Sequence, residues 1–304
     1  MKKILVTGCQ GFIGSELVRQ LIKHNIVIGI DDLSSSLINK DLKNKNFLFI
    51  KGRCQDAKII NKIKGKIDFI YHLAGQSSGE KSYNNTGEDL EKNTLTTVKL
   101  LEFALKKKCK RFIYASSMCV YGNSKIGKEN EKCEPISFYG LSKLTSENYI
   151  KKFKKKGVDF TIVRLFNVYG KNQKLNNLKQ GILRIYLTQL SKKNHLIVKG
   201  SKNRFRDFIR IEKVVNLMIK IPKISNTKNE IINFGTGKRT YIRDIIKLLK
   251  TNIKKKFTVT YTKGTPDDQF GIISNIKKMK MIFNDSSKFD TKKDLSEVIK
   301  KFNL

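Results

Sequence analysis

The segment Thr7-Gly8-Cys9-Gln10-Gly11-Phe12-Ile13-Gly14 constrains the fold of this chain more than any other feature. It follows a short apolar stretch, Lys2 to Val6, that predicts a strand, and it precedes apolar residues at helical spacing from Phe12 to Lys23. Its three evenly spaced glycines let the backbone turn tightly and approach a pyrophosphate, whose charge is met by the N–H groups and positive dipole end of the helix. A glycine-rich surface turn without a ligand is the alternative interpretation.

Two acidic residues follow the next predicted strand. The apolar stretch Ile26 to Ile30 ends at Asp31 and Asp32. A carboxylate at the tip of this strand can accept hydrogen bonds from both hydroxyls of a ribose, and it repels a 2′-phosphate. The pair therefore favours NAD over NADP as the bound dinucleotide, with a solvated acidic loop as the alternative.

Tyr139 and Lys143 lie four residues apart in Phe138 to Phe153, a stretch that predicts a helix. One helical turn places both side chains on the same face, so the ammonium can lie beside the phenol and favour its ionised form. An unperturbed phenol titrates near ~10, so Tyr139 needs a neighbouring cation to act as a base near neutral pH. The pair indicates an enzyme that moves a proton next to its bound dinucleotide.

The order of predicted elements indicates an α/β fold with a doubly wound parallel sheet, because strands and helices alternate up to about Gly170. We expect residues 1–170 to form a Rossmann NAD-binding domain and residues 171–304 a smaller, mixed substrate domain, with residues 230–250 returning to the first. In the second half, Phe257 to Tyr261 resembles part of a hairpin. The other strand candidates are Phe47 to Ile50, Asp68 to His72, Arg111 to Ala115 and Phe160 to Arg164, and the helical stretches are Asp56 to Ile63, Asp89 to Lys107 and Phe138 to Phe153.

The formal net charge of +37 over 304 residues raises the question of nucleic-acid binding. Basic runs such as Lys106 to Arg111 and Lys151 to Lys156 consist mostly of lysine and are not interleaved with stacking aromatic residues. Because arginine is the usual reader of bases, we expect no dedicated nucleic-acid partner. A field of this sign would still attract a small anion such as a nucleotide-linked substrate.

Other features limit the cellular setting. No apolar run approaches the ~20 residues needed to cross a bilayer, and the start lacks a secretory signal, so we expect a soluble protein without a membrane partner. The five cysteines are odd in number and form no C-x-x-C pair, which favours reduced thiols in the cytoplasm. With three histidines in the chain, we expect no metal site.

Six motifs in a fixed order carry a resemblance to a known family. The chain resembles extended short-chain dehydrogenase/reductases and, within them, the NAD-dependent epimerase/dehydratase family, particularly UDP-glucose 4-epimerase-like enzymes. The resemblance runs from residue 2 to about Asp268. The motifs are Thr7-Gly8-x-x-Gly11-Phe12-Ile13-Gly14, His72-Leu73-Ala74-Gly75, Ser116-Ser117-x-x-Val120-Tyr121-Gly122, Tyr139-x-x-x-Lys143, Arg164-x-x-Asn167-Val168-Tyr169-Gly170 and Arg206-Asp207-Phe208-Ile209.

The resemblance implies a role for each matching residue. Tyr139 is the expected base, Lys143 its electrostatic partner and a ligand of the nicotinamide ribose, and Ser117 the hydroxyl that shares the substrate proton. The expected cofactor-binding residues, with Asp32 added from the strand-end argument above, are Gly8, Gly11, Phe12, Ile13, Gly14, Asp31, Asp32, Leu73, Ala74, Gly75, Asn93, Tyr139 and Lys143. The expected substrate-binding residues are Ser117, Asn167, Asn177, Leu178 and Arg206.

Simpler interpretations compete with three of these roles. For Ser117 the alternative is a turn at a strand end, and for Asn93, which the family uses to support the active-site backbone, it is an ordinary polar position on a helix. For Arg206 the alternative is a surface ion pair with Asp207.

The chain also departs from the family pattern. Met118 and Cys119 stand where sugar-nucleotide dehydratases place acidic residues, which argues against dehydration, and we interpret Cys119 as a pocket or packing residue. Arg53 replaces an aspartate that in the family meets the adenine amine. Thr265 stands where 4-epimerases place an arginine, which leaves Arg206 to hold more of the substrate diphosphate.

These features together predict an NAD-dependent sugar-nucleotide epimerase, most closely of the UDP-hexose 4-epimerase type, that oxidises the sugar transiently to a ketone and returns the hydride. One alternative is an NAD(P)H-dependent reductase or dehydrogenase of a sugar-nucleotide ketone. Another is a catalytically idle member that binds nucleic acid, against which the intact Ser117, Tyr139 and Lys143 set argues. The resemblance further implies a homodimer formed through the helices at 89–107 and 138–153, and a role in carbohydrate metabolism and cell-surface polysaccharide biosynthesis.

Overall fold

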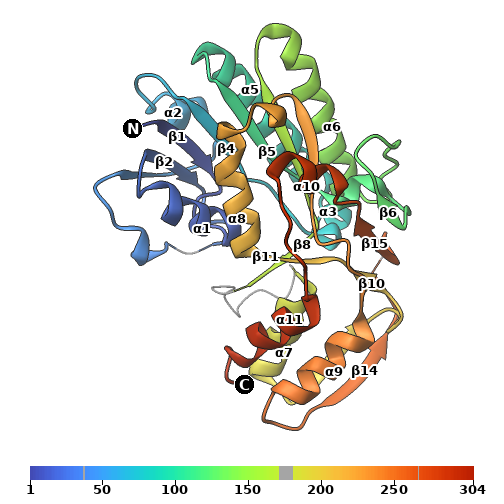
Figure 1. The fold of residues 1–304 in the computed structure, drawn as a ribbon. Coiled ribbons are helices and arrows are strands. Elements are labelled where there is room, and N and C mark those ends of the chain that lie inside the picture. The colour runs from blue at the N-terminus through green and yellow to red at the C-terminus, as the bar shows by residue number, and fades with distance from the viewer. Residues whose placement is uncertain (37, 171–180, 266) are drawn as a thin grey trace.

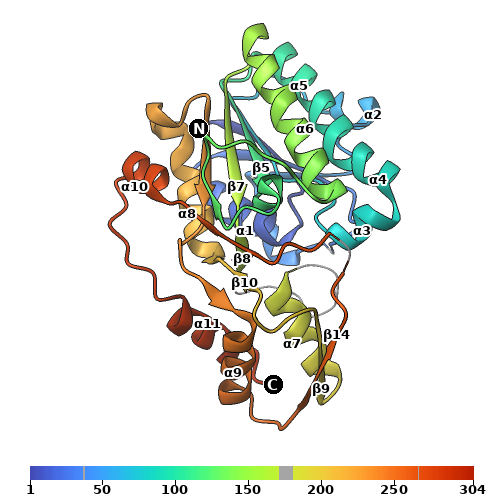
Figure 2. The same ribbon diagram turned by 90° about the vertical axis from the view of Figure 1, so that its right-hand side faces the viewer.

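A computed structural model describes residues 1–36, 38–170, 181–265 and 267–304 of the chain. Its main feature is a seven-stranded sheet in the order β12-β7-β5-β4-β1-β2-β3, in which every neighbouring pair is parallel. Helices cover both faces of this sheet (Figures 1 and 2). The predicted doubly wound Rossmann sheet is therefore confirmed. Two predicted substrate residues, Asn177 and Leu178, lie outside the described residues.

The strands of the large sheet match the predicted apolar stretches to within about two residues at either end. They are β1 (Lys3–Thr7), β2 (Ile26–Asp31), β3 (Phe47–Lys51), β4 (Phe69–His72), β5 (Arg111–Ser117), β7 (Phe160–Leu165) and β12 (Glu230–Phe234). The last of these comes from far along the chain and forms the edge of the sheet beside β7.

Alternate residues of each strand face opposite helical layers. Ile4 and Val6 of β1 pack in one apolar core with α1 (Phe12–Leu21) and α8 (Ile211–Lys220). Leu5, between them, packs in a second core with α5 (Thr96–Lys106) and α6 (Phe138–Phe153). Burial on both faces explains why these strands read as continuous apolar runs.

Parts of the second half of the chain form a smaller, mixed region, whereas α8 and β12 belong with the large sheet. A third apolar core joins α7 (Ile182–Lys192), α9 (Ile242–Asn252) and α11 (Thr291–Lys300) to β9 (His195–Lys199) and β14 (Thr258–Thr262). A four-stranded mixed sheet lies between this region and the large sheet. It consists of β13 (Thr240–Tyr241), β10 (Phe205–Arg206), β15 (Gly271–Ser274) and β6 (Ile126–Gly127), while β11 (Phe208–Arg210) pairs with β8 (Asn167–Tyr169) and α10 (Lys277–Phe283) follows β15.

Two local expectations were wrong. The stretch Phe257 to Tyr261 is no hairpin, because β14 pairs in parallel with β9, from which more than 50 residues separate it. A two-residue alternation specifies a strand but not the direction of its partner. The predicted helix Asp89 to Lys107 is also interrupted, since α4 (Thr86–Leu90) and α5 are joined by a π-helical turn at Glu91–Leu95.

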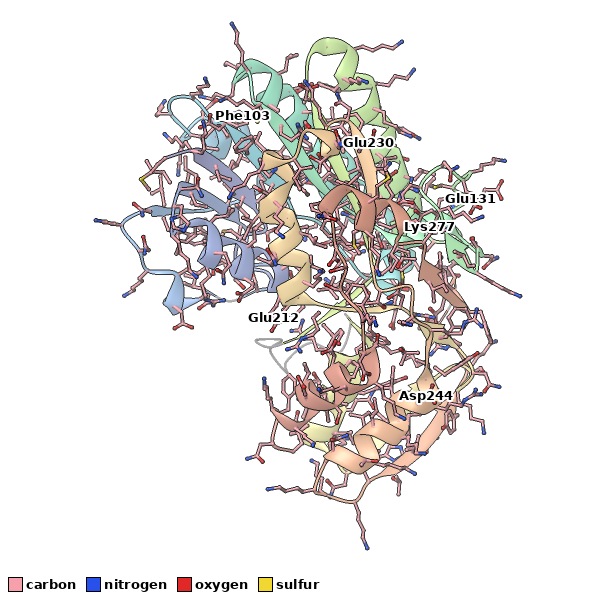
Figure 3. The ribbon with its side chains drawn as sticks, in the orientation of Figure 1. Phe103, Glu131, Glu212, Glu230, Asp244 and Lys277 are labelled. Carbon is pink, nitrogen blue, oxygen red and sulfur yellow. The ribbon has the colours of Figure 1, made fainter. Side chains whose placement is uncertain are left out.

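Basic side chains project from both halves of the molecule in the view of Figure 3. In Figure 3, side chains that end in nitrogen project from the helices of the large sheet and from the smaller region alike. Among the described residues, no helix is both long and apolar enough to cross a membrane.

A buried ion pair fastens α6 to the sheet. Arg164 of β7 donates from Nε and Nη2 to the two carboxylate oxygens of Glu147 at 3.0 and 2.7 Å, and the side chains are only 3% and 0% exposed. Ser116 of β5 also donates to Glu147, at 2.5 Å. The pair therefore fixes the helix that carries Tyr139 and Lys143 against the strand that carries Ser117.

We expect Glu147→Gln to lower the free energy of unfolding by about 3 kcal/mol or more, because it leaves the Arg164 charge buried without its partner. The matched control is Glu131→Gln, which breaks an exposed pair with Lys128 and should cost less than about 1 kcal/mol. Urea unfolding of both variants measures the difference. Equal losses would show that the buried pair does not anchor the helix.

Candidate active site

The glycine turn after β1 is packed more tightly than any other residue type allows. Gly8 has φ +69°, and a Cβ built on it would lie 2.8 Å from the Ala74 nitrogen. A Cβ on Gly14 would lie 2.0 Å from the Gly8 carbonyl oxygen. Neither position accepts a side chain, so the turn brings bare backbone to the start of α1, as an anion-binding turn requires.

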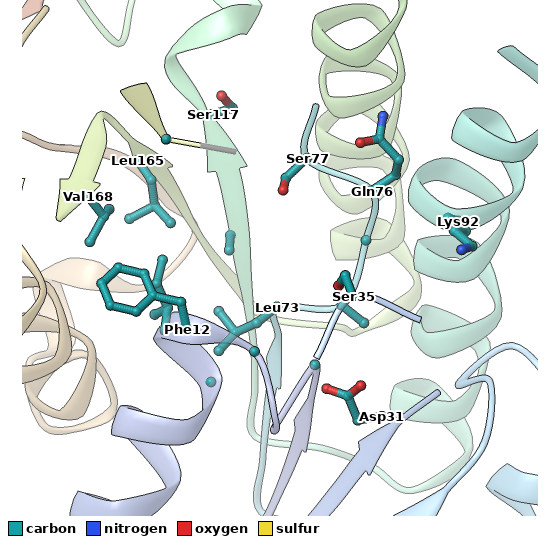
Figure 4. A pocket seen from close by; sticks show the side chains of 18 of the residues that line it. Phe12, Asp31, Ser35, Leu73, Gln76, Ser77, Lys92, Ser117, Leu165 and Val168 are labelled. Atoms are coloured by element: carbon teal, nitrogen blue, oxygen red, sulfur yellow. The ribbon is translucent and has the colours of Figure 1, made fainter. Parts of the chain in front are cut away.

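A first cavity of about 330 Å³ opens above this turn, at the carboxyl ends of the strands. Figure 4 shows that it extends from Asp31, at the end of β2, to Ser117, at the end of β5. It contains every described residue predicted to bind the cofactor except Asn93. These lining residues are Gly8, Gly11, Phe12, Ile13, Gly14, Asp31, Asp32, Leu73, Ala74, Gly75, Tyr139 and Lys143, with Ser117 beside them.

Asp31 is held in one orientation by its neighbours. Its Oδ2 accepts a hydrogen bond from the Gln10 N–H at 2.9 Å, and its Oδ1 accepts from the Leu33 N–H and the Ser36 hydroxyl at 2.9 and 3.0 Å. The carboxylate is buried at the mouth of the glycine turn. It thus lies where the predicted ribose contact needs an acceptor.

Arg53 also lines the first cavity, in the place where the family has an aspartate. Its Nη1 lies 3.3 Å from Glu91 Oε1, an oxygen that Gln55 Nε2 contacts at 3.1 Å. Sequence reasoning missed Gln55 and Cys54 as lining residues, because they follow β3 in a segment without a motif.

Helix α6 turns Tyr139 and Lys143 inward. Its start is capped by Ser137, whose Oγ accepts from the Gly140 N–H at 3.1 Å. The Lys143 Nζ lies 5.9 Å from the centre of the Tyr139 ring and donates to the Ala115 carbonyl at 3.0 Å. The structure therefore brings the predicted pair together, as the helical spacing requires.

Ser117 serves two purposes at the end of β5. It lines the first cavity beside Tyr139, and its Oγ accepts from the Cys119 N–H at 3.2 Å, which caps the short helical turn Met118–Tyr121. The strand-end interpretation is thus correct as a description of its backbone. It leaves the hydroxyl within the cavity.

Burial is the largest cause of the pKa shifts of Tyr139 and Lys143. Burial raises the pKa of Tyr139 well above its ordinary range, although the Ser117 hydroxyl opposes that rise. Burial also lowers the pKa of Lys143 from 10.5 to about 8, against the charges of Asp89 and Glu147. In the polypeptide without a bound cofactor, the largest effect on the phenol is therefore the cost of removing the phenolate from water.

Asn93 lies behind the cavity and not in its lining. Its Oδ1 is buried, has no partner among the described residues and faces Gly75, where a Cβ would approach it to 2.4 Å. Its Nδ2 donates to Asp89 Oδ1 at 3.0 Å, and Ser142 donates to Asp89 Oδ2 at 2.5 Å. The position agrees with a supporting role for Asn93. Sequence reasoning missed Asp89, which its i−4 spacing from Asn93 could have indicated.

A second cavity of about 690 Å³ adjoins the first, and Ser77, Asn167, Gly181 and Ile182 line both. It contains Met118 and Cys119, so Cys119 is a pocket residue. It also contains Arg206, whose Nη2 donates to Asp268 at 2.8 Å. Residues that sequence reasoning missed in this lining include Tyr186, Gln189, Lys199 and Asp268.

The alternative interpretation of Arg206 as a surface ion pair with Asp207 is wrong. Both residues are buried, and the Asp207 carboxylate accepts from the backbone N–H groups of Thr236, Gly237 and Ser274, each at 2.9 Å. Asp207 thereby ties β10 to the turn after β12 and to β15. Arg206 is therefore not paired with Asp207, and it lines the second cavity.

The site thus consists of two adjoining cavities. One has a glycine cradle and a strand-end carboxylate, and the other has buried arginines. This arrangement is typical of a Rossmann enzyme that binds a nucleotide cofactor and a second ligand. Residues 4–235 match the model of the NAD dependent epimerase/dehydratase family. The chain belongs to that family, and NAD is the cofactor that the family uses. The glycine cradle and Asp31 fit this cofactor, because no side chain fills the turn and the carboxylate suits a ribose without a 2′-phosphate.

Individual proteins agree with this assignment. A provisionally named UDP-glucose 4-epimerase of Methanocaldococcus jannaschii is 35% identical over 90% of each chain. A UDP-N-acetylglucosamine 4-epimerase of Methanobrevibacter ruminantium, solved with UDP-N-acetylmuramic acid, superimposes with a TM-score of 0.89 at 28% identity, over 99% of this chain and 98% of that one. A UDP-glucuronic acid 4-epimerase of Bacillus cereus, solved with UDP-glucuronic acid and NAD, gives 0.87 at 27% identity, over 98% and 99%.

We expect Gly14→Ala to weaken NAD binding by at least about tenfold, because the new Cβ displaces the Gly8 carbonyl and opens the turn. Calorimetric titration with NAD measures the loss. Gly79→Ala is the control, since a Cβ there meets nothing within 4 Å. Wild-type affinity in the Gly14 variant would mean that the turn does not hold the pyrophosphate.

Proposed function

We propose that the protein is an NAD-dependent sugar-nucleotide epimerase, most closely of the UDP-hexose 4-epimerase type. The observation that carries the proposal is the position of Ser117, Tyr139 and Lys143, which line the first cavity, while the two residues after Ser117, Met118 and Cys119, line the second. A sugar held in the second cavity would present a hydroxyl to Tyr139 while its hydrogen-bearing carbon faces the first. The three relatives reported above are named as epimerases of UDP-sugars, which favours UDP as the nucleotide of the substrate.

In the proposed reaction, Tyr139 begins as a phenolate that Lys143 stabilises, and it accepts the proton of the sugar hydroxyl at C4. Bound NAD would supply the acceptor for the C4 hydride, return it later, and add a positive charge near the phenol. Ser117 would hold the oxygen on which the ketone forms. After the sugar has turned over, Tyr139 returns the proton to that oxygen, so the centre is inverted and no net oxidation remains.

The residues beside Ser117 disfavour dehydration. Met118 and Cys119 line the second cavity and offer no carboxylate for the additional acid–base step that elimination needs. The described carboxylates in this cavity are those of Glu80, Asp267 and Asp268. Glu80 pairs with Lys199 and Asp268 with the arginines, and none of the three stands beside Ser117 in the sequence. Epimerisation needs only the one proton carrier that Tyr139 provides.

We also propose that different parts of the chain bind the cofactor and the substrate. Residues 1–170, joined by β12 at the start of 230–250, would hold NAD, and residues 171–304 would hold the nucleotide sugar through Arg206 and the face of α7, with α9 packing in the third core. Asn167 would bind at the junction, where both cavities meet. We further place the enzyme in the cytoplasm, in carbohydrate metabolism that supplies cell-surface polysaccharide, a setting that suits its five free cysteines.

Incubation of the purified protein with UDP-glucose, UDP-N-acetylglucosamine and UDP-glucuronic acid, without added cofactor, tests the proposal. We expect conversion of one or more of them to the 4-epimer, with no net consumption of NAD or NADH. Consumption of NADH with a keto sugar nucleotide would identify a reductase instead. Retention of RNA at moderate salt with neither activity would identify the idle, nucleic-acid-binding alternative.

We expect Tyr139→Phe to lower turnover by at least about a hundredfold while NAD stays bound, because the variant loses the proton carrier but keeps the ring. Tyr149→Phe on the outer face of the same helix is the control and should retain wild-type turnover. Epimer formation and the cofactor content of the purified proteins are the two readouts. A Tyr139 variant with nearly normal turnover would remove the proposed base.

We propose that the enzyme is a homodimer. Figure 2 shows α4, α5 and α6 side by side on the outside of the large sheet. Apolar side chains from this layer are largely exposed, namely Leu90, Leu95, Phe138, Leu141 and Tyr149. An apolar face on neighbouring helices suits the four-helix contact of a twofold dimer.

We expect Leu141→Glu to convert the dimer to a monomer at micromolar concentration, because it buries a charge in that contact. Light scattering coupled to gel filtration measures the mass. Met281→Glu, on an exposed part of α10, is the control and should leave the dimer intact. A monomeric wild-type protein would contradict the proposed assembly.

A further inference from the structure

Asp89 of α4 is a buried carboxylate whose hydrogen-bond donors are all neutral. The residue is 1% exposed. Its Oδ1 accepts from Gln76 Nε2 at 2.8 Å and from Asn93 Nδ2 at 3.0 Å, and its Oδ2 accepts from the Ser142 hydroxyl at 2.5 Å. These bonds satisfy the two oxygens, but they bring no positive charge to a group that is costly to bury.

Lys143 is a buried cation in the matching situation. The residue is 5% exposed, and its Nζ donates to the neutral Ala115 carbonyl at 3.0 Å. A Cβ built on Gly75 would lie 3.6 Å from this Nζ and 2.4 Å from Asn93 Oδ1. The Asn93 amide thus extends from Asp89, which its nitrogen contacts, to the surroundings of the ammonium.

Asp89 is the carboxylate that is left to balance this ammonium. Burial lowers the pKa of Lys143 to about 8, and the charge of Asp89 opposes the shift more than that of Glu147 does. Glu147 is already paired with Arg164 through two hydrogen bonds at 3.0 and 2.7 Å. Burial keeps the other titratable groups that face Lys143 uncharged near neutral pH, because it raises the pKa of the thiol and the phenols and lowers that of the imidazole. They are Cys119, Tyr114, Tyr139 and His72.

The oxygens of Asp89 also orient the neighbouring amides. An ionised carboxylate accepts hydrogen bonds and donates none, so it turns the amide nitrogens of Gln76 and Asn93 toward itself. Asn93 Oδ1 is thereby directed at Gly75. Gln76 also donates to the Ser78 carbonyl at 2.8 Å and accepts from the Ser78 N–H. Asp89 thus fixes the loop at residues 76–78, which lines both cavities (Figure 4).

We propose that Asp89 is a positioning residue that acts through Lys143, because its charge balances the buried ammonium while its oxygens fix Asn93 and the 76–78 loop. The effect on turnover rests on the proposed function, whereas the effect on the ammonium does not. A buried ammonium without a counter-ion favours its neutral form. Without the charge of Asp89, Lys143 would lose its proton at a lower pH and could no longer stabilise the Tyr139 phenolate.

Nitrogen NMR titration of protein with labelled lysine side chains tests the proposal, and Lys143→Met assigns the signal. We expect Asp89→Asn to lower the pKa of Lys143 by at least about one unit, with or without bound NAD. The alkaline limb of the pH profile of epimerisation should move to lower pH in the same direction. The asparagine can keep the hydrogen bonds, because Ser142 Oγ lies 3.1 Å from the Tyr139 carbonyl and can donate there while it accepts from the new amide.

Two variants separate the charge of Asp89 from its packing. Glu88→Gln is the matched control, because it removes a charge from the preceding residue, whose carboxylate pairs with Lys92 at 2.8 Å. It should leave the pKa of Lys143 unchanged. Ser142→Ala removes one hydrogen bond from Asp89 but leaves its charge, and it should shift the pKa of Lys143 much less than Asp89→Asn does.

Urea unfolding measures the same coupling without any titration. We expect Lys143→Met to be less destabilising in Asp89→Asn than in the wild type, because it removes an ammonium that has lost its counter-ion. The same effect of Lys143→Met in both backgrounds would contradict the proposal. So would an Asp89→Asn protein that fails to fold and that Lys143→Met does not restore.

The NMR outcomes separate this proposal from the proposed function. An unchanged pKa of Lys143 in Asp89→Asn would overturn the role of Asp89, and so would an equal shift in Ser142→Ala, because the effect would then come from packing. A lower pKa of Lys143 in a protein that interconverts no UDP-sugar would support the role of Asp89 and reject the epimerase.

Discussion

Burial of the Lys143 ammonium beside Tyr139 is the constraint on which the rest of the site depends. An ammonium out of water needs partners, and here the Ala115 carbonyl accepts from it at 3.0 Å while the Tyr114 ring lies 4.8 Å away. The helix that carries the pair is fixed by the Glu147–Arg164 ion pair on one side and by Asp89, through Ser142, on the other. Because Lys143 is held in this way, Tyr139 is presented in one position in the lining of the first cavity.

The parallel sheet supplies the remainder of the geometry. Carboxyl ends of parallel strands gather at one edge, so residues from distant segments line one cavity. The glycine turn follows β1, Asp31 ends β2, Gly75 follows β4 and Ser117 ends β5. On the far side, Asp207 joins β10 to β15 and leaves Arg206 directed into the second cavity. In the proposed reaction, a hydride would leave the sugar carbon toward NAD while a proton leaves its hydroxyl oxygen toward Tyr139.

Local patterns in the sequence predicted the parts of the site that depend on short-range geometry. Three patterns each depend on a single turn or strand: the glycine spacing, the acidic end of β2, and the four-residue interval between Tyr139 and Lys143. The structure brings the residues of these patterns together in one cavity. Features set by distant contacts were not predictable in this way. The parallel pairing of β14 with β9 and the Asp268 contact each join distant segments that share no sequence motif. The π-helical turn around Asn93 likewise has no motif that predicts it. The pKa of Tyr139 also depends on the depth of burial, which the helical spacing does not report.

The acidity of Tyr139 in the presence of oxidised NAD tests the account most directly. The polypeptide alone raises the pKa of this phenol by burial, so the positive charge of the bound cofactor, added to that of Lys143, must lower it for catalysis. Carbon NMR titration of tyrosine-labelled protein, with and without oxidised NAD, measures the shift, and Tyr139→Phe assigns the signal. The account predicts a pKa lower by at least about one unit in the NAD complex than in the free protein. The same pKa in both states would contradict it.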